Sequence, residues 1–180
     1  MKKLLLILCI FSLPSALAQP FARSWDAWFG QLQGGANYGM QDLGPLYTLG
    51  VYKSKNNHGY GIELSSSSIN ECRVLSGSLT LSQDLLRIRR NRRTPFYLYA
   101  TAGVGLSHLR NIQIQDDFLL NGDDMLHASI SLCPTYFFSR DFALQWKTQY
   151  TRYGLVDYQL NAAYSTSLGI LFLIPEFKPF

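Results

Sequence analysis

The sequence predicts an all-β protein, a closed antiparallel eight-stranded up-and-down transmembrane β-barrel. An export signal opens the chain, and segments that alternate apolar and polar residues recur after it between turn signals. The longest apolar run after the signal has seven residues, Leu168 to Ile174, whereas a helical span needs about twenty. Because lipid cannot satisfy an open sheet edge, strands that cross it must close into a barrel.

The first 18 residues are predicted to be a signal peptide. Met1 to Lys3 are followed by the apolar run Leu4 to Leu13 and by the small-residue cleavage site Ala16 to Ala18. The signal directs export of the chain, and its cleavage after Ala18 leaves 19–28 as a periplasmic lead-in. The apolar run is too short to favour an uncleaved anchor helix.

The exported part has about 160 residues, the length of one domain. Loss of Lys2 and Lys3 lowers the formal charge from +4 to +2, since 14 basic residues then face 12 acidic ones. This weak balance does not favour a nucleic-acid partner. Cys72 and Cys133 are predicted to be free thiols, one in an outer loop and one on an inward strand face, farther apart than the roughly 7 Å Cα limit for a bridge. A disulfide in an oxidising compartment is the alternative.

The first four predicted strands each carry apolar residues at alternate positions. The strands and these positions are 29–38 (Leu32, Ala36, Tyr38), 46–54 (Tyr47, Leu49, Val51), 59–67 (Tyr60, Ile62, Leu64) and 75–85 (Leu75, Leu79, Leu81). In the first strand the intervening positions include Gln31 and Gln33, so its two faces differ sharply. The segment 55–59, Lys-Asn-Asn-His-Gly, separates the second and third strands as a hairpin turn.

The last four predicted strands repeat this pattern over longer stretches. They are 95–107 (Phe96, Leu98, Ala100, Ala102, Val104, Leu106), 125–137 (Leu126, Ala128, Ile130, Leu132), 142–153 (Phe142, Leu144, Trp146, Tyr150) and 164–174 (Tyr164, Thr166, Leu168, Ile170, Phe172, Ile174). Pro134 cannot donate to a β-ladder, so it marks a bulge or a weak point in the sixth strand.

The composition of the two faces decides which one is inside. A soluble barrel of the lipocalin type would bury the apolar set. Here the polar set is mostly Gln, Ser, Thr, Gly and Tyr and nearly lacks the Lys and Glu of solvated sheets, while the apolar set carries Trp and Tyr toward strand ends, as in an aromatic girdle. The sequence therefore predicts an apolar exterior and a polar lumen. Within that lumen, Glu63 and Lys147 are predicted to pair.

An even strand number with the amino terminus in the periplasm fixes the predicted topology. Turns at 55–58, 87–94 and 139–141 then face the periplasm. The connections at 39–45, 68–74, 108–124 and 154–159 face outward. The longest connection lies on the outer side, which is typical of outer-membrane barrels.

Three segments carry a resemblance to a known family. Tyr97 to Ser107, Phe142 to Tyr150 and the closing Ser167 to Ile174 are similar to the mid-barrel strand, the penultimate strand and the assembly signal of the small OmpA/OmpX-type outer-membrane β-barrels. The resemblance implies a place in the bacterial cell outer membrane, insertion by the barrel-assembly machinery, and contact with outer-membrane lipid and lipopolysaccharide. The six residues 175–180 depart from it, because such chains usually stop near the signal.

Two charged segments are candidate binding sites. A basic turn holds Arg87, Arg89, Arg90, Arg92 and Arg93, and guanidinium groups grip lipid phosphates or an acidic periplasmic partner. An outer acidic loop holds Asp116, Asp117, Asp123 and Asp124, and paired carboxylates bind divalent cations. For both segments the alternative is a solvated loop. The acidic spacing matches no calcium loop, so no metal and no cofactor are predicted.

Acyl hydrolysis needs a nucleophile, a base within hydrogen-bond reach and an orienting acid. His127 and Ser129 share a strand face, an arrangement similar to that of the lipid A deacylases. The next acid at a suitable spacing, Asp141, is about 12 residues or roughly 40 Å away along a strand. Ser107, His108 and Asp124 lie nearer the outer rim. The sequence therefore predicts no catalytic site and a protein that is not an enzyme.

The sequence predicts a monomeric barrel whose lumen is filled by side chains and has no open pore. Its predicted role is structural or surface interaction: envelope assembly, adhesion, or binding of a periplasmic or surface protein. Two alternatives stay open, an outer-membrane lipid A-modifying enzyme of the acyl hydrolase type and a conjugative-transfer envelope component, since the arrangement is also similar to the TraO-type barrels of conjugative transposons.

Overall fold

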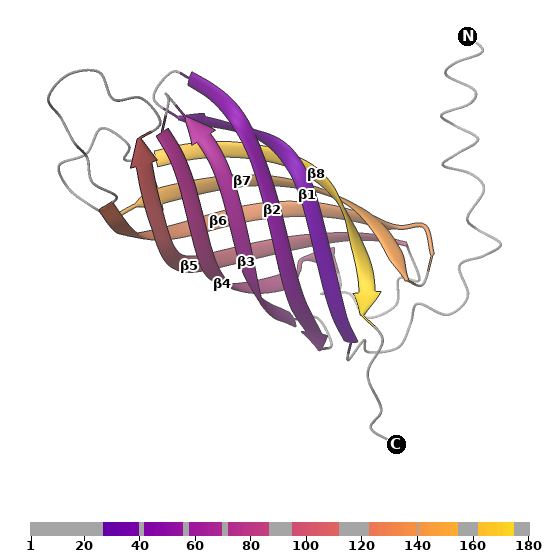
Figure 1. The fold of residues 1–180 in the computed structure, drawn as a ribbon. Helices are drawn as coiled ribbons and strands as arrows, with labels where there is room; N and C mark the ends of the chain where they lie inside the picture. The colour runs from indigo at the N-terminus through magenta and orange to yellow at the C-terminus, as the bar shows by residue number, and fades with distance from the viewer. Residues whose placement is uncertain are drawn as a thin grey trace, which may run out of the picture.

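Eight antiparallel strands close into one barrel, in chain order, in the computed structural model (Figure 1). The strands are β1 Ala27–Gly39, β2 Asp42–Lys55, β3 His58–Ile69, β4 Cys72–Asp84, β5 Phe96–Asn111, β6 Asp123–Phe137, β7 Phe142–Tyr153 and β8 Ala162–Ile174. The residues that the structure describes are 27–39, 42–55, 58–69, 72–86, 95–111, 123–139, 141–154 and 162–174. The predicted fold class is confirmed. The barrel end with Ala27 and Ile174 is called the terminal end, and the opposite end the loop end.

The register of the strands sets the tilt and width of the barrel. One path through hydrogen-bonded partners visits Tyr38, Tyr164, Tyr150, Ile130, Ala102, Leu81, Tyr60, Lys53 and Trp28. It returns to β1 at Trp28, ten residues from its start at Tyr38. Ten residues of stagger over eight strands correspond to a tilt of about 40° and a backbone radius of about 8 Å. Such an interior is only wide enough for side chains.

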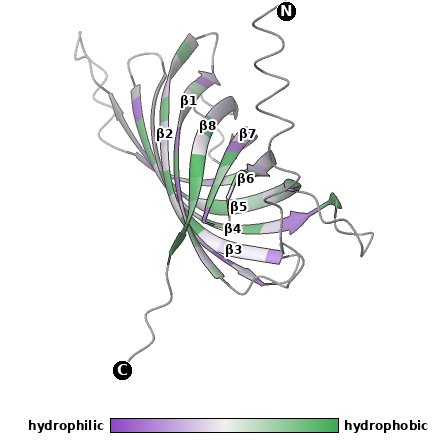
Figure 2. Ribbon diagram, turned by 90° about the vertical axis from the view of Figure 1, so that its right-hand side faces the viewer, coloured by the Kyte–Doolittle hydropathy of each residue, from purple (hydrophilic) through white to green (hydrophobic). Residues whose placement is uncertain are grey.

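Apolar side chains cover the outside of the barrel. The exposed large hydrophobic residues include Leu32, Tyr47, Leu49, Val51, Ile62, Leu64, Leu79, Leu81, Val104, Leu106, Leu126, Ile130, Leu144, Trp146, Leu168 and Ile170. In most strands they alternate with polar or small residues, whereas the end of β8, from Leu168 to Ile174, is apolar apart from Gly169 (Figure 2). Soluble monomers rarely expose an apolar patch beyond a few hundred Å², so this belt is suited to a hydrocarbon layer. The predicted outward face is confirmed.

Aromatic residues lie at both edges of the belt, as the sequence predicts. Trp28, Phe96 and Phe142 are exposed at the terminal end, and the ammonium nitrogen of Lys53 lies 5.5 Å from the ring centroid of Trp28. Tyr38 is exposed at the loop end. This placement fits an amphipathic ring at the level of lipid headgroups, with the lysine reaching toward water.

Several strands reach farther toward the loop end than predicted. Residues 42–45 belong to β2 rather than to a loop, and 72–74, 108–111 and 123–124 are likewise strand residues. Pro45 is paired with Ala36 of β1, but the β2–β3 ladder begins only at Leu46. Pro45 therefore needs no N–H on its β3 side, which is why proline is tolerated there.

The other differences in the strand boundaries are small. β1 begins at Ala27, so the predicted lead-in does not extend to Trp28. At Pro134 the β6–β7 ladder skips Cys133 and Pro134 and resumes in the same register, so this position is a weak point and not a bulge. The predicted signal peptide and the extension 175–180 lie outside the described residues. Within the described ranges, no helix is long and apolar enough to cross a membrane.

Candidate functional site

A buried ion pair joins opposite walls of the lumen. Glu63 lies on β3 and Lys147 on β7, four strands apart around the barrel, and Lys147 Nζ is 2.5 Å from Glu63 Oε1. The hydroxyl of Tyr52 donates a hydrogen bond to the same oxygen. The two residues predicted to pair therefore do so, and both are buried. Because each charge would be costly alone, the pair ties the two walls together.

Glycines on β2 and β3 make room for Tyr52 in the lumen. A Cβ added at Gly61 would lie 2.5 Å from Cδ1 of Tyr52, and one added at Gly50 would lie 2.7 Å from Cε2 of the same ring. The ring of Tyr52 therefore occupies space that any larger residue at these positions would fill. The two glycines let the tyrosine hydroxyl reach Glu63 in the middle of the barrel.

An amide network fills the lumen on the terminal side of this pair. The side-chain nitrogens of Gln31 and Gln33 donate to Oε1 of Gln145, at 3.0 and 2.9 Å. Gln145 in turn donates to Thr135 Oγ1 at 2.9 Å, and the hydroxyl of Ser167 donates to Gln33 at 3.0 Å. These buried groups satisfy one another, as a polar interior requires.

Hydroxyl groups and a histidine occupy the lumen on the loop side. The hydroxyl oxygens of Ser76 and Ser107 lie 2.7 Å apart, and Ser107 Oγ lies 2.8 Å from Nδ1 of His127. Nearby, the side-chain nitrogen of Asn37 donates to Ser67 Oγ at 3.2 Å, while Asn37 Oδ1 is buried and forms no hydrogen bond with a described residue. This half is built from smaller polar groups than the amide network.

Apolar clusters close both ends of the lumen. At the terminal end the buried residues are Phe29, Tyr97, Phe137, Ala143 and Leu171, the terminal plug. The ring of Phe137 makes edge contacts with those of Phe29 and Tyr97, at centroid distances of 6.1 and 5.1 Å. At the loop end they are Val74, Met125, Tyr153 and Ala163, the loop plug. The cavities inside have volumes of about 60 and 30 Å³, room for one or two waters.

The residues considered for the alternative acyl hydrolase do not form a catalytic arrangement. His127 and Ser129 are buried and face the lumen, whereas Asp141 lies in the turn at the terminal end. The imidazole bonds Ser107 instead, a pair that sequence spacing missed because β5 and β6 bring it together only in register. A serine hydroxyl beside an imidazole nitrogen resembles a nucleophile and its base. Both groups are buried, Ser107 with only 1% of its surface exposed, so lipid cannot reach them.

The predicted charged segments fall largely outside the described residues. This holds for the five arginines between 87 and 93, for Asp116 and Asp117, and for the side chain of Asp123. The prediction that Asp123 and Asp124 lie in a loop is wrong, because they begin β6 and pair with β5. The carboxylate of Asp124 is 2.9 Å from Nδ1 of His108 on the exposed outer face.

Cys133 is a free thiol buried in the lumen, as predicted. Cys72 is the first residue of β4, with its Cα opposite Asn111, so its predicted position in a loop is wrong. The side chain of Cys72 is not among those described. In the described part of the chain, no three histidine, cysteine, aspartate or glutamate side chains gather in a way that would hold a metal ion.

Comparison with known proteins supports the fold. No protein-family model matches the sequence, and no curated protein is similar to it in sequence. Among solved structures, the chain is similar to Neisserial surface protein A, with a TM-score of 0.63 and 10% identity over 84% of this chain and 99% of that one. It is also similar to the outer membrane enzyme PagL, with a TM-score of 0.52 and 14% identity over 81% and 99% of the two chains. A de novo designed transmembrane β-barrel matches with a TM-score of 0.50 and 9% identity over 86% and 100%. The fold is that of the small eight-stranded outer-membrane β-barrels.

Proposed function

We propose that the chain is an outer-membrane barrel with a structural or surface-interaction role and that it is not an enzyme. The observation that carries this proposal is the sealed lumen, filled by side chains and closed by an apolar plug at each end. A solute has no path through such an interior. Interactions with other molecules then take place at the two barrel ends and on the outer wall.

Three features support the proposed location in the outer membrane, and the loop lengths support the orientation. The export signal sends the chain out of the cytoplasm, the apolar belt suits a bilayer, and the fold is shared with outer-membrane barrels. The terminal end faces the periplasm and the loop end faces outward, because the loop end carries two long connections, 112–122 and 154–161, against one at the terminal end, 85–95, and outer-membrane barrels carry their longer loops outside.

Cell fractionation and conductance measurements test this proposal. The chain should be found in the outer-membrane fraction, migrate as a compact band in an unheated denaturing gel, and unfold to a slower band on heating. Purified protein in a planar bilayer should give no single-channel steps. Purified protein that stays dissolved without detergent, or that conducts ions, would contradict the proposal.

Lipid A acyl hydrolysis is the second candidate, favoured only by the Ser107–His127 pair. Mass spectrometry of lipid A from cells with and without the protein decides between the two. We expect no change in acyl number with the wild-type chain or with Ser107→Ala. A loss of one acyl chain that disappears in Ser107→Ala would establish the enzyme.

The basic turn provides a test for protein partners. Replacing Arg87, Arg89, Arg90, Arg92 and Arg93 by glutamine removes five guanidinium groups on the periplasmic side of the proposed topology. Envelope proteins that co-purify with the wild-type barrel should be lost from this variant if the turn binds an acidic partner. Conjugative-transfer proteins among those lost would favour the TraO-like role, whereas unchanged co-purification would leave a solvated turn.

A further inference from the structure

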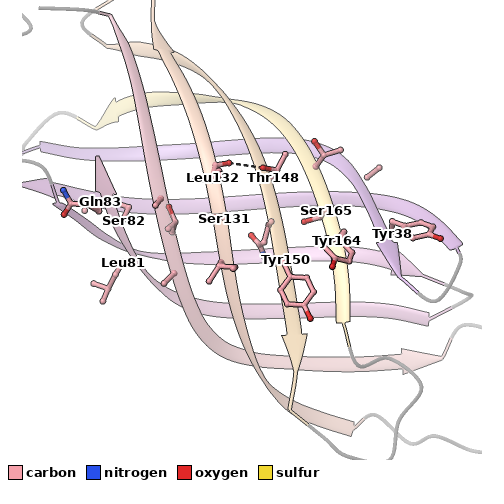
Figure 3. A pocket seen from close by; sticks show the side chains of 18 of the residues that line it. Tyr38, Leu81, Ser82, Gln83, Ser131, Leu132, Thr148, Tyr150, Tyr164 and Ser165 are labelled. Atoms are coloured by element: carbon pink, nitrogen blue, oxygen red, sulfur yellow. Dashed lines mark hydrogen bonds between the residues drawn. The ribbon is translucent and has the colours of Figure 1, made fainter. Parts of the chain in front are cut away.

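A groove of about 960 Å³ follows the outer wall of the barrel (Figure 3). Its lining runs along the same hydrogen-bonded path that defines the stagger, from Tyr38 on β1 at the loop end to His58 on β3 near the terminal end. Leu81, Ile130 and Tyr164 line it and are strongly exposed, so the groove opens outward and not into the lumen.

Small residues form the floor of the groove within the apolar belt. The outward small residues that line it are Ala36, Ala100, Ala102, Thr148 and Thr166. The polar atoms of this floor already have partners, because Trp146 Nε1 donates to Thr166 Oγ1 at 2.7 Å and Thr148 Oγ1 donates to the carbonyl of Leu132 at 3.5 Å. The occupant of the groove is therefore apolar. Since the groove curves around the barrel, a flexible chain follows it better than a rigid helix or a second barrel.

A cation lies above the groove at the loop end. The rings of Tyr150 and Tyr164 lie 4.9 Å apart at the groove edge, where Figure 3 shows them on neighbouring strands. Arg152 follows two residues after Tyr150 on the same outward face, opposite Ala162 of β8. It is exposed, and neither of the ion pairs in the described ranges, His108–Asp124 and Glu63–Lys147, includes it. A guanidinium above an apolar groove matches a molecule with an anionic head and a hydrocarbon tail.

We propose that this surface binds one molecule of lipid A, with a phosphate at Arg152 and an acyl chain in the groove. The proposal rests on the orientation given above, in which the loop end lies in the outer leaflet. The Tyr150–Tyr164 pair lies at headgroup level, and the acyl chain descends over Thr148 and Thr166 toward Ala102. The polar floor contacts stay intact, so binding adds only apolar contacts and one charge-assisted interaction.

Native mass spectrometry of the refolded full-length barrel tests the charge. The protein is mixed in detergent with purified lipid A or with phosphatidylglycerol, and the fraction carrying one lipid is measured. The wild type should retain lipid A in preference to phosphatidylglycerol, and Arg152→Gln should reduce lipid A binding about tenfold. The matched control is Arg73→Gln, which removes another exposed arginine at the loop end, on β4 and away from the groove. It should bind as the wild type does.

Filling the groove tests the acyl site independently. Ala102→Phe places a ring in the groove, whereas Val104→Phe adds one on the same strand and outer face but outside it. Only Ala102→Phe should weaken lipid A binding. The gel shift on heating and the fractionation show whether each variant folds and reaches the outer membrane. A failure of the proposed lipid A site is thereby distinguished from a failure of the proposed barrel role. Equal losses in both arginine variants, equal losses in both phenylalanine variants, or equal retention of phosphatidylglycerol would overturn the proposal.

Discussion

The two halves of the lumen are filled with different chemistry. The terminal half holds a carboxamide network under a plug of three large aromatic rings, whereas the loop half holds hydroxyls and one imidazole under a smaller plug. Between them stands the Glu63–Lys147 pair. The comparison indicates that the terminal half is the more firmly packed and that the loop half contributes less to the free energy of unfolding. Four tests with five substitutions address this difference, from the largest expected effect to the smallest.

Lys147→Met breaks the link between the halves. It leaves the carboxylate of Glu63 buried without its cation, which typically costs about 3–5 kcal/mol of unfolding free energy. Urea unfolding in lipid vesicles, followed by tryptophan fluorescence, measures the loss. The double variant Glu63→Gln with Lys147→Met removes both charges and should recover much of the stability. A single variant as stable as the wild type would show that Glu63 is not held as a charged partner.

The plugs at the two ends are compared by Phe137→Ala and Met125→Ala. Phe137 contacts two other rings, so its loss should cost about 3–5 kcal/mol. Met125 lies in the loop plug beside Val74, Tyr153 and Ala163, and its flexible thioether makes less specific contacts than an aromatic ring, so the cost should be about 2 kcal/mol. The same unfolding assay measures both. A larger loss at Met125 would reverse the proposed order of the two ends.

Gln145→Leu probes the amide network of the terminal half. The substitution leaves the side-chain nitrogens of Gln31 and Gln33 without their shared acceptor, at a cost of about 1–3 kcal/mol. Thr148→Val, on the same strand but facing outward, is the matched control and should change the unfolding free energy by less than about 0.5 kcal/mol. A neutral Gln145→Leu would mean that water replaces the lost acceptor.

Ser107→Ala probes the loop half and should have the smallest effect. It removes hydrogen bonds to Ser76 and His127, which are worth about 1 kcal/mol in net stability. Ser129→Ala is the control, because its buried hydroxyl makes no hydrogen bond with another described residue. A loss well above that of Gln145→Leu would show that the loop half is the more tightly coupled one.

Sequence patterning was sufficient for the faces of every strand but not for their ends. Alternation placed Leu32, Leu49 and Ile130 outside, because a strand has a period of two and each residue meets either lipid or the lumen. The loop-end boundaries were missed around Pro45, where proline and glycine read as turn signals. Pairing with β1 overrode that local signal, since the proline needs no donor toward β3.

By itself, the sequence determined the strand number, the outward face and the partners Glu63 and Lys147, because these follow from periodicity and from the cost of isolated buried charge. Only the tertiary structure decided the ten-residue stagger, the two plugs, the Ser107–His127 contact and the groove beneath Arg152. Each of these depends on which residues of different strands lie side by side in the closed barrel. That register is a property of the whole barrel, and the sequence pattern of a single strand does not reveal it.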